Sequence, residues 1–132
     1  GVHLYNKSAW DRQTTLHFNA CAGRNSHLSP TGTAVEATDL DSLLQGAPVT
    51  LLKMDIEGSE SKALTGAAHT IITWRPKLYV CAYHRNEDLF SLPLQILNLC
   101  PDYKLYFRHS PYIPAWESNF YCTPTHLDDN DH

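Results

Sequence analysis

The chain has 132 residues, of which 42% are hydrophobic and 18% are charged, so it is long enough for one folded domain and its composition excludes global disorder. Its formal net charge of −4 at pH 7 argues against a protein built to bind nucleic acid. No apolar run approaches the ~20 residues that span a bilayer, and no signal peptide is visible, which predicts a cytoplasmic protein without a membrane span.

The first third of the chain is predicted to hold three strands and one short helix. The strands are expected at Val2–Tyr5, at Thr14–Phe18 and at Thr33–Thr38, the last antiparallel to the second. A loop rich in Gly, Ser, Asn and Pro is expected over Asn19–Thr33. Asp39 or Asp41 is expected to cap a helical turn that runs through Leu44.

The middle of the chain shows the clearest pattern. Val49–Met54 is nearly continuous in apolar residues, which predicts a strand buried on both faces. A helix is predicted from about Ser59 to Trp74, because its apolar residues recur on one face. Lys77–Tyr83 is predicted to be a further buried strand.

The last third is predicted to hold a helix and two strands. The helix covers Glu87–Leu99, with Pro93 placed in its first turn or at a kink. Strands are expected at Tyr103–Phe107 and Ser118–Cys122, with a loop over Ser110–Trp116 between them and an acidic, frayed tail at Asp128–His132. This order predicts an α/β fold with a mostly parallel sheet that ends in an antiparallel hairpin.

The four cysteines are predicted to be buried free thiols. They are widely spaced without a CxxC pair, and three lie in apolar runs; they are Cys21, Cys81, Cys100 and Cys122. Free thiols fit a reducing cytosol.

Polar side chains gather where the predicted strands end, which is where ligands bind in open α/β sheets. They are Asn6, Ser8 and Asp11 after the first strand, Asp55, Glu57 and Glu60 after the central strand, His84 after the next, and Arg108 and His109 after the fourth. Such a concentration of ionisable groups at one edge indicates a binding or catalytic site.

Each of these groups also has a structural interpretation. Acidic residues stabilise a helix N-terminus, yet capping needs one acid and not three within six residues, which favours a function for Asp55 and leaves Glu60 open. His84 is either structural or a general base, since imidazoles exchange protons near neutral pH. Arg108 and His109 either bind an anionic group of a substrate or pair with the acids.

Several segments resemble the FkbM-type methyltransferases. The central one is Leu51–Glu60 followed by Ala63–Ala67, which is similar to the family pattern of lysine, a hydrophobe, D-[IV]-E-G-x-E and a helix with A-L-x-G-A. Further elements match in order: Asn6–Asp11, Thr38–Leu44, Pro76–Leu78, Tyr83–Leu89, Pro101–His109 and Trp116–Glu117. The resemblance covers roughly residues 2 to 122.

The resemblance implies a Rossmann-like methyltransferase fold, S-adenosylmethionine as the methyl donor, and a hydroxyl of a sugar, glycolipid or secondary metabolite as the acceptor. It places Asp55 near the transferred methyl group with Glu57 beside it, and His84 on the acceptor side, as catalytic residues. Asn6, Ala9, Trp10, Asp11 and Asp55 become candidates for binding the cofactor. Glu60, Arg108 and His109 become candidates for binding the acceptor. No residue is assigned to a metal. The paired acids allow a metal ion to bind but do not require one.

One departure from the family pattern affects the cofactor site. The first two strands, the glycine-rich turn and the ribose-binding acid are expected before residue 1, and none of the six glycines forms a G-x-G-x-x-G motif. Residues 1–127 are therefore interpreted as an incomplete domain and 128–132 as a tail. The chain alone is expected to bind the cofactor weakly or not at all, and the exposed edge of the Thr50–Met54 strand favours homo-oligomers through strand pairing.

Two alternatives to a methyltransferase stay open at this point. The first is a non-catalytic interaction module with an α/β fold, which the missing glycine-rich turn favours. The second is a metal-dependent hydrolase in which Asp55, Glu57, His84 and His109 hold the metal, although their spacing matches no specific ligand motif.

Overall fold

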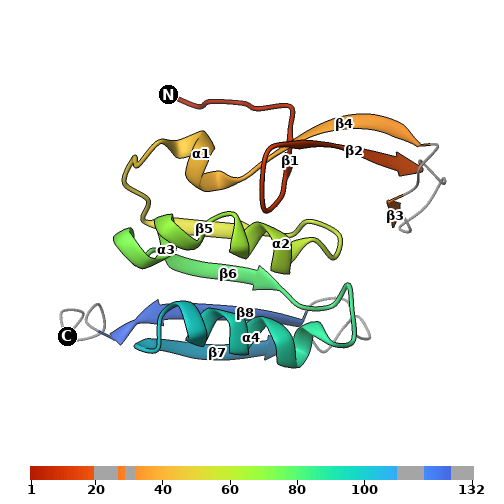
Figure 1. Ribbon diagram of the computed structural model, residues 1–132. Helices are drawn as coiled ribbons and strands as arrows, with labels where there is room; N and C mark the ends of the chain where they lie inside the picture. Colours follow the sequence, from red (N-terminus) through yellow and green to blue (C-terminus); the bar gives the residue numbers. More distant parts are fainter. Residues whose placement is uncertain (20–26, 29–31, 110–117, 126–132) are drawn as a thin grey trace.

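The computed structural model describes residues 1–19, 27–28, 32–109 and 118–125. These residues form two four-stranded sheets and four helices, whose arrangement is shown in Figure 1. The predicted Ser110–Trp116 loop, the Asp128–His132 tail, Cys21 and most of the predicted loop at 19–33 lie outside the described residues.

The first sheet has the strand order β1-β4-β2-β3. Its strands are β1 (Ser8–Ala9), β2 (Thr14–Asn19), β3 (His27–Leu28) and β4 (Thr33–Thr38). The antiparallel pairing of β2 with β4 confirms the prediction. The predicted strand at Val2–Tyr5 is wrong, because this segment pairs with no described strand and Val2 and Leu4 are 88% and 91% exposed.

The second sheet has the order β5-β6-β8-β7 and holds the core of the molecule. Its strands are β5 (Leu51–Met54), β6 (Lys77–Cys81), β7 (Tyr103–His109) and β8 (Ser118–Pro124). β8 lies between β6 and β7 and is antiparallel to both, which confirms the predicted C-terminal hairpin. In the second sheet β5, β6 and β7 run in one direction and β8 runs opposite to them, so the predicted mostly parallel orientation is confirmed there. It is not confirmed for the first sheet, where β2 is antiparallel to both β3 and β4 and the parallel pair is β1–β4.

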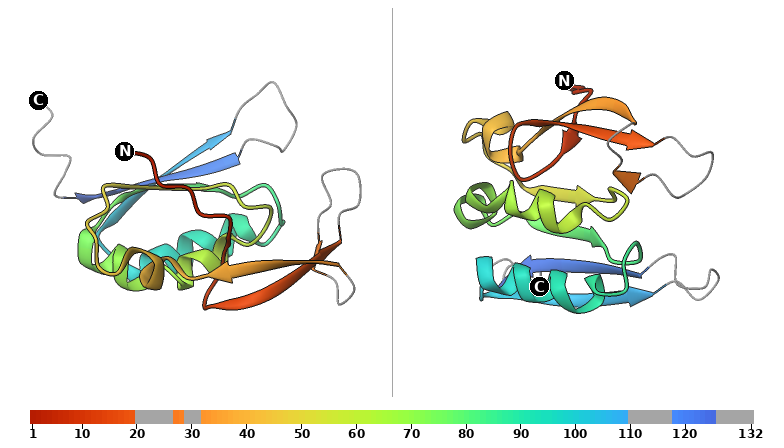
Figure 2. Two further views of the ribbon diagram at one scale, coloured as in Figure 1. Left: turned by 90° about the horizontal axis from the view of Figure 1, so that it is seen from above. Right: turned by 45° about the vertical axis from the view of Figure 1, so that its right-hand side comes forward.

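Helices cover one face of the second sheet, as the left view of Figure 2 shows for α2 (Glu60–Thr65), α3 (Ala68–Trp74) and α4 (Asp88–Leu99). Residues of β5 alternate between this covered face and the other. Met54 is therefore buried, whereas Leu51 is 59% exposed, and the prediction that this strand is buried on both faces is wrong. β5 is also an edge strand, as expected.

The predicted helix from Ser59 to Trp74 is divided into α2 and α3. The carboxylate of Asp41, in the short helix α1 (Leu40–Leu44), accepts hydrogen bonds from the backbone N–H groups of His69 and Thr70 and so begins a new helix at that point. The backbone N–H of Asp41 donates to the carbonyl of Gly66, at the end of α2. The apolar periodicity therefore correctly predicted helical structure in this segment, but it did not predict the break between α2 and α3.

The start of α1 agrees with the prediction, since the Asp39 side chain accepts a hydrogen bond from the Ser42 backbone N–H at 2.8 Å. Pro93 lies inside α4, five residues after its first residue, so its placement in the first turn is wrong. An interior proline costs about 3 kcal/mol. Burial of Leu92 and Ile96 on the same helix offsets this cost.

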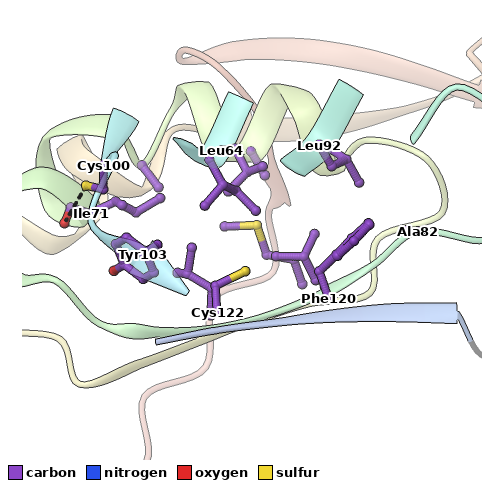
Figure 3. Close-up of a cluster of buried hydrophobic side chains, with 14 residues drawn as sticks. Leu64, Ile71, Ala82, Leu92, Cys100, Tyr103, Phe120 and Cys122 are labelled. Atoms are coloured by element: carbon purple, nitrogen blue, oxygen red, sulfur yellow. Dashed lines mark hydrogen bonds between the residues drawn. The ribbon is translucent and has the colours of Figure 1, made fainter. Parts of the chain in front are cut away.

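The core fills the space between α2, α3 and α4 and the second sheet (Figure 3). Its members include the aliphatic residues Leu64, Ile71, Leu92 and Ile96 and the aromatic residues Tyr103 and Phe120. The thiols of Cys81, Cys100 and Cys122 are free and buried, as predicted. No helix in the described ranges has the length and apolar character needed to cross a membrane.

Candidate functional site

The candidate site lies where β5 and β6 end. Asp55 follows the last residue of β5, and Tyr83 and His84 follow β6 by two and three residues. Because β5 and β6 are parallel neighbours, their carboxyl ends meet at the same edge of the sheet.

His84 is the centre of this site. Its Nε2 lies 3.5 Å from Oε2 of Glu57 and 3.7 Å from Oδ1 of Asp55, and its Nδ1 lies 3.0 Å from Oε1 of Glu60. The imidazole is 9% exposed, whereas the side chains of Asp55 and Glu57 are 42% and 62% exposed. We call these four residues, Asp55, Glu57, Glu60 and His84, the rim cluster.

Glu60 anchors the rim cluster from inside the protein. Its side chain is fully buried at the first position of α2, and Oε1 accepts a hydrogen bond from the Ile56 backbone N–H at 3.0 Å. The same oxygen lies 3.0 Å from Nδ1 of His84, which suits a hydrogen bond donated by Nδ1–H to this carboxylate and leaves Nε2 facing the exposed carboxylates. Oε2 of Glu60 has no hydrogen-bond partner among the described residues.

The turn between β5 and α2 explains why glycine follows Glu57. Gly58 has a φ of +88°, which glycine adopts without strain, and a β-carbon there would lie 3.1 Å from Nε of Arg85 and 3.6 Å from Cβ of His84. Glu57 itself has a φ of +55°. This tight turn folds the Glu57 carboxylate back toward the imidazole.

Tyr83 holds Asp55 in place. Its hydroxyl donates a hydrogen bond to Oδ1 of Asp55 at 2.8 Å, and its ring lies 4.2 Å from the imidazole of His84 between centroids. Burial, together with the hydrogen bond to the Asp55 carboxylate, raises the pKa of Tyr83 well above its ordinary value.

A second buried carboxylate lies behind the rim cluster. Asp88, the first residue of α4, is 4% exposed, and its Oδ2 has no hydrogen-bond partner in the part of the chain that the structure describes. Burial, followed by the charge of Glu60, raises the pKa of Asp88 to about 6.

The segment after β1 packs on α2, where the sequence predicted contacts to a cofactor. Asp11 forms an ion pair with Lys62 at 2.8 Å, and the Lys62 ammonium lies 5.6 Å from the centroid of a Trp10 ring. The hydrogen bond from Lys62 lowers the pKa of Asp11, and the second oxygen of Asp11, Oδ1, is buried without a hydrogen-bond partner. Ala9 packs against the core, while Asn6 is exposed.

Arg108 and His109 end β7, two strands away from β6, which corresponds to about 10 Å across the sheet. The His109 ring forms a hydrogen bond with the Ser118 hydroxyl through Nδ1 at 2.9 Å. Arg108 lines a shallow hollow together with Tyr106 and Tyr121. Neither forms a salt bridge with the acids among the described residues, so the predicted ion pair is not formed. His109 also lies outside the rim cluster, contrary to the four-ligand hydrolase site.

Three residues of the site were not singled out from the sequence. Tyr83 directly precedes His84, and its position at a strand end was the available signal. Asp88 resembles an ordinary acidic residue at a helix start, which hides its burial. Lys62 is 51 residues from Asp11, and no local pattern connects them.

Two comparisons with known proteins bear on this arrangement. The family model for the methyltransferase FkbM domain matches residues 4–109. A crystal structure of a methyltransferase FkbM from Methylobacillus flagellatus KT is similar with a TM-score of 0.73 and 32% sequence identity, over 91% of this chain and 28% of that one. The chain thus spans less than a third of that protein's length. No curated protein matches.

Proposed function

This chain belongs to the FkbM methyltransferase family, and we propose that it carries the acceptor side and the adenine side of a site that transfers a methyl group from S-adenosylmethionine to a hydroxyl. The single observation that supports the chemistry best is the rim cluster. A buried carboxylate orients an imidazole whose free nitrogen faces two exposed carboxylates.

When bound, S-adenosylmethionine supplies a methyl group on a positively charged sulfur. The task of this chain is then to hold the acceptor oxygen and to favour loss of its proton. Asp55, Glu57 and Nε2 of His84 present only acceptor atoms at the exposed end of the cluster, so a hydroxyl that enters there donates its hydrogen to them. Tyr83 and Glu60 keep these acceptors in position, and positioning accounts for much of the catalysis of such transfers.

The residues after β1 fit the adenine end of this cofactor. Oδ1 of Asp11 is a buried acceptor that has no hydrogen-bond partner among the described residues, although the Arg12 guanidinium lies 3.8 Å from it, and it suits an amino group such as that of adenine. The half-buried ring of Trp10, next in the chain, offers an aromatic face. Ala9 supports this segment from the core. Asn6 and Asp55 are included in the proposed cofactor site on the family resemblance alone.

We propose a sugar, glycolipid or secondary metabolite as the acceptor. Arg108 and His109 then bind its more distant groups, because they lie at the same end of the sheet as the rim cluster but two strands away. Tyr106 and Tyr121 beside Arg108 provide apolar ring surface, which suits a sugar ring or an apolar tail.

The cofactor half of the proposal is tested by NMR titration of the chain with S-adenosylhomocysteine, adenosine and homocysteine, because NMR detects even weak binding. Adenosine is expected to shift the indole N–H signal of Trp10 and the amide signal of Asp11, and homocysteine is not. An equal response to homocysteine would contradict the assignment of these residues to adenine.

The transfer itself is tested with radiolabelled S-adenosylmethionine and a panel of hydroxyl acceptors. Asp55→Asn keeps the size of the side chain but removes its charge, and it is expected to abolish transfer without changing the unfolding curve. Glu36→Gln is the matched control, since it removes an exposed carboxylate from the first sheet. A preparation that binds S-adenosylhomocysteine but methylates no hydroxyl would refute the proposed function.

A further inference from the structure

The rim cluster contains more negative than positive charge. Asp55, Glu57 and Glu60 can carry three negative charges around His84, which supplies at most one positive charge. The neighbouring Arg85 lies against the turn at Gly58 and forms an ion pair with Glu87 at 4.0 Å, so the charges of Arg85 and Glu87 offset each other. The carboxylates of Asp55, Glu57 and Glu60 repel one another strongly, because all three approach one imidazole and Glu60 is fully buried.

We propose that the rim cluster binds a divalent cation through Asp55, Glu57 and Nε2 of His84. Two ligands of a cation with bonds of about 2.1 Å stand about 3.0 Å apart in an octahedral site and about 3.4 Å apart in a tetrahedral one. The distances of 3.5 Å and 3.7 Å from Nε2 to the two carboxylates come within a few tenths of an ångström of the tetrahedral value and exceed the octahedral value by about 0.5 Å and about 0.7 Å. The exposed Glu57 side chain has room to make the adjustment.

The buried side of the cluster supports the same conclusion. His84 is nine-tenths buried, yet its Nε2 points at two carboxylates and not into the core. Glu60 fixes the other ring nitrogen at 3.0 Å, which is the carboxylate–histidine pair that orients metal-binding imidazoles. Glu60 is itself fully buried, and its Oε2 has no hydrogen-bond partner among the described residues. Ligand atoms of Asp55, Glu60 and His84 all lie within 4.8 Å of one another, a group that does not include Glu57, so the exposed Glu57 side chain completes the proposed site by rotating toward Asp55.

The mixed donor set selects the class of cation. Carboxylates favour Mg²⁺ and Mn²⁺, and an imidazole favours Zn²⁺ and related ions, so one nitrogen with two carboxylates suits Mn²⁺ or Zn²⁺. A cation at this place would occupy the acceptor atoms of Asp55, Glu57 and His84, and it would then bind the acceptor oxygen in their place and lower the pKa of the hydroxyl. This catalytic consequence rests on the proposed function, whereas cation binding itself does not.

The test uses Mn²⁺ alone, with neither cofactor nor acceptor, and follows free Mn²⁺ by electron paramagnetic resonance. The wild-type chain is expected to bind one ion. Affinity should fall by a factor of about ten or more in Asp55→Asn, His84→Asn and Glu57→Gln, because each removes one ligand. His69→Asn is the matched control, since it removes an exposed histidine from α3 and should leave the affinity unchanged.

The same titration can overturn the inference. A folded wild-type chain that binds no Mn²⁺ at millimolar concentration would do so. Undiminished binding in Asp55→Asn and His84→Asn would also do so, because it would place the ion elsewhere, for example at Asp128, Asp129 and Asp131. Should His84→Asn fail to fold, Glu57→Gln decides the question, since that side chain is exposed. Failure of cation binding leaves the methyl-transfer assay as a separate test of the proposed function.

Discussion

Replacement of Gly66 by alanine should destabilise the protein, although the same change stabilises most helices. The backbone of Gly66, the C-cap of α2, has a φ of −74°, so alanine meets no conformational barrier there and would gain at most about 1 kcal/mol of helix propensity. The added β-carbon, however, would lie 2.9 Å from Cβ of Asp39, 3.1 Å from the Trp10 carbonyl carbon and closer still to the Trp10 carbonyl oxygen.

The size of the effect follows from these two opposing contributions. Overpacking costs about 1–3 kcal/mol of stability, and the upper end applies because the nearest neighbour is a backbone atom. When the gain in helix propensity is subtracted, the free energy of unfolding should fall by about 2 kcal/mol. Urea unfolding followed by tryptophan fluorescence measures this loss. Thr73→Ala on the exposed side of α3 is the control, and it should gain a few tenths of a kcal/mol. A Gly66→Ala protein as stable as the wild type would refute the proposed contact between α2 and the Trp10 segment.

Two further predictions concern buried polar groups. Because burial raises the pKa of Asp88 from 3.8 to about 6, the unfolded chain ionises before the folded one, and the wild type loses stability as the pH rises between these values. Asp88→Asn should therefore gain stability relative to the wild type between about pH 4 and about pH 7 in urea unfolding. A difference that stays constant with pH would contradict the burial of this charge. Tyr103→Phe should cost about 1–3 kcal/mol in the same assay, because the buried hydroxyl donates a hydrogen bond to the Pro76 carbonyl; an unchanged midpoint would mean that water replaces this donor.

The sequence predicted helices and strands well where the apolar residues repeat along a buried face. It predicted them poorly where a strand depends on a partner strand. The residues of α4 and β6 repeat at the spacing that their buried faces require, and both elements were expected. Val2–Tyr5 alternates in the same way, but alternation does not supply a neighbouring strand, and the segment is exposed. The end of α2 depends on Asp41, which lies 28 residues before His69 in the chain and carries no local signal.

The sequence predicted which residues form the candidate site, but not which of them is buried and which are exposed. Placing acids and a histidine after adjacent parallel strands was enough to bring Asp55, Glu57, Glu60 and His84 together. Which carboxylate is buried depends on the turn at Gly58 and on the direction in which α2 leaves it, and these are tertiary features. The burial of Glu60 therefore could not be read from its position in the sequence.

The position of β8 between β6 and β7 has a consequence for folding during synthesis. β7 leaves the ribosome before β8 but has no strand to pair with in the second sheet until β8 follows. At about 5–20 residues per second, the nascent chain spends on the order of a second with this half of the sheet open. In that interval the hydrogen-bonding edge of β6 and the apolar side chains of β7 are exposed together, which makes the interval the period of greatest risk for misfolding or for capture by a chaperone.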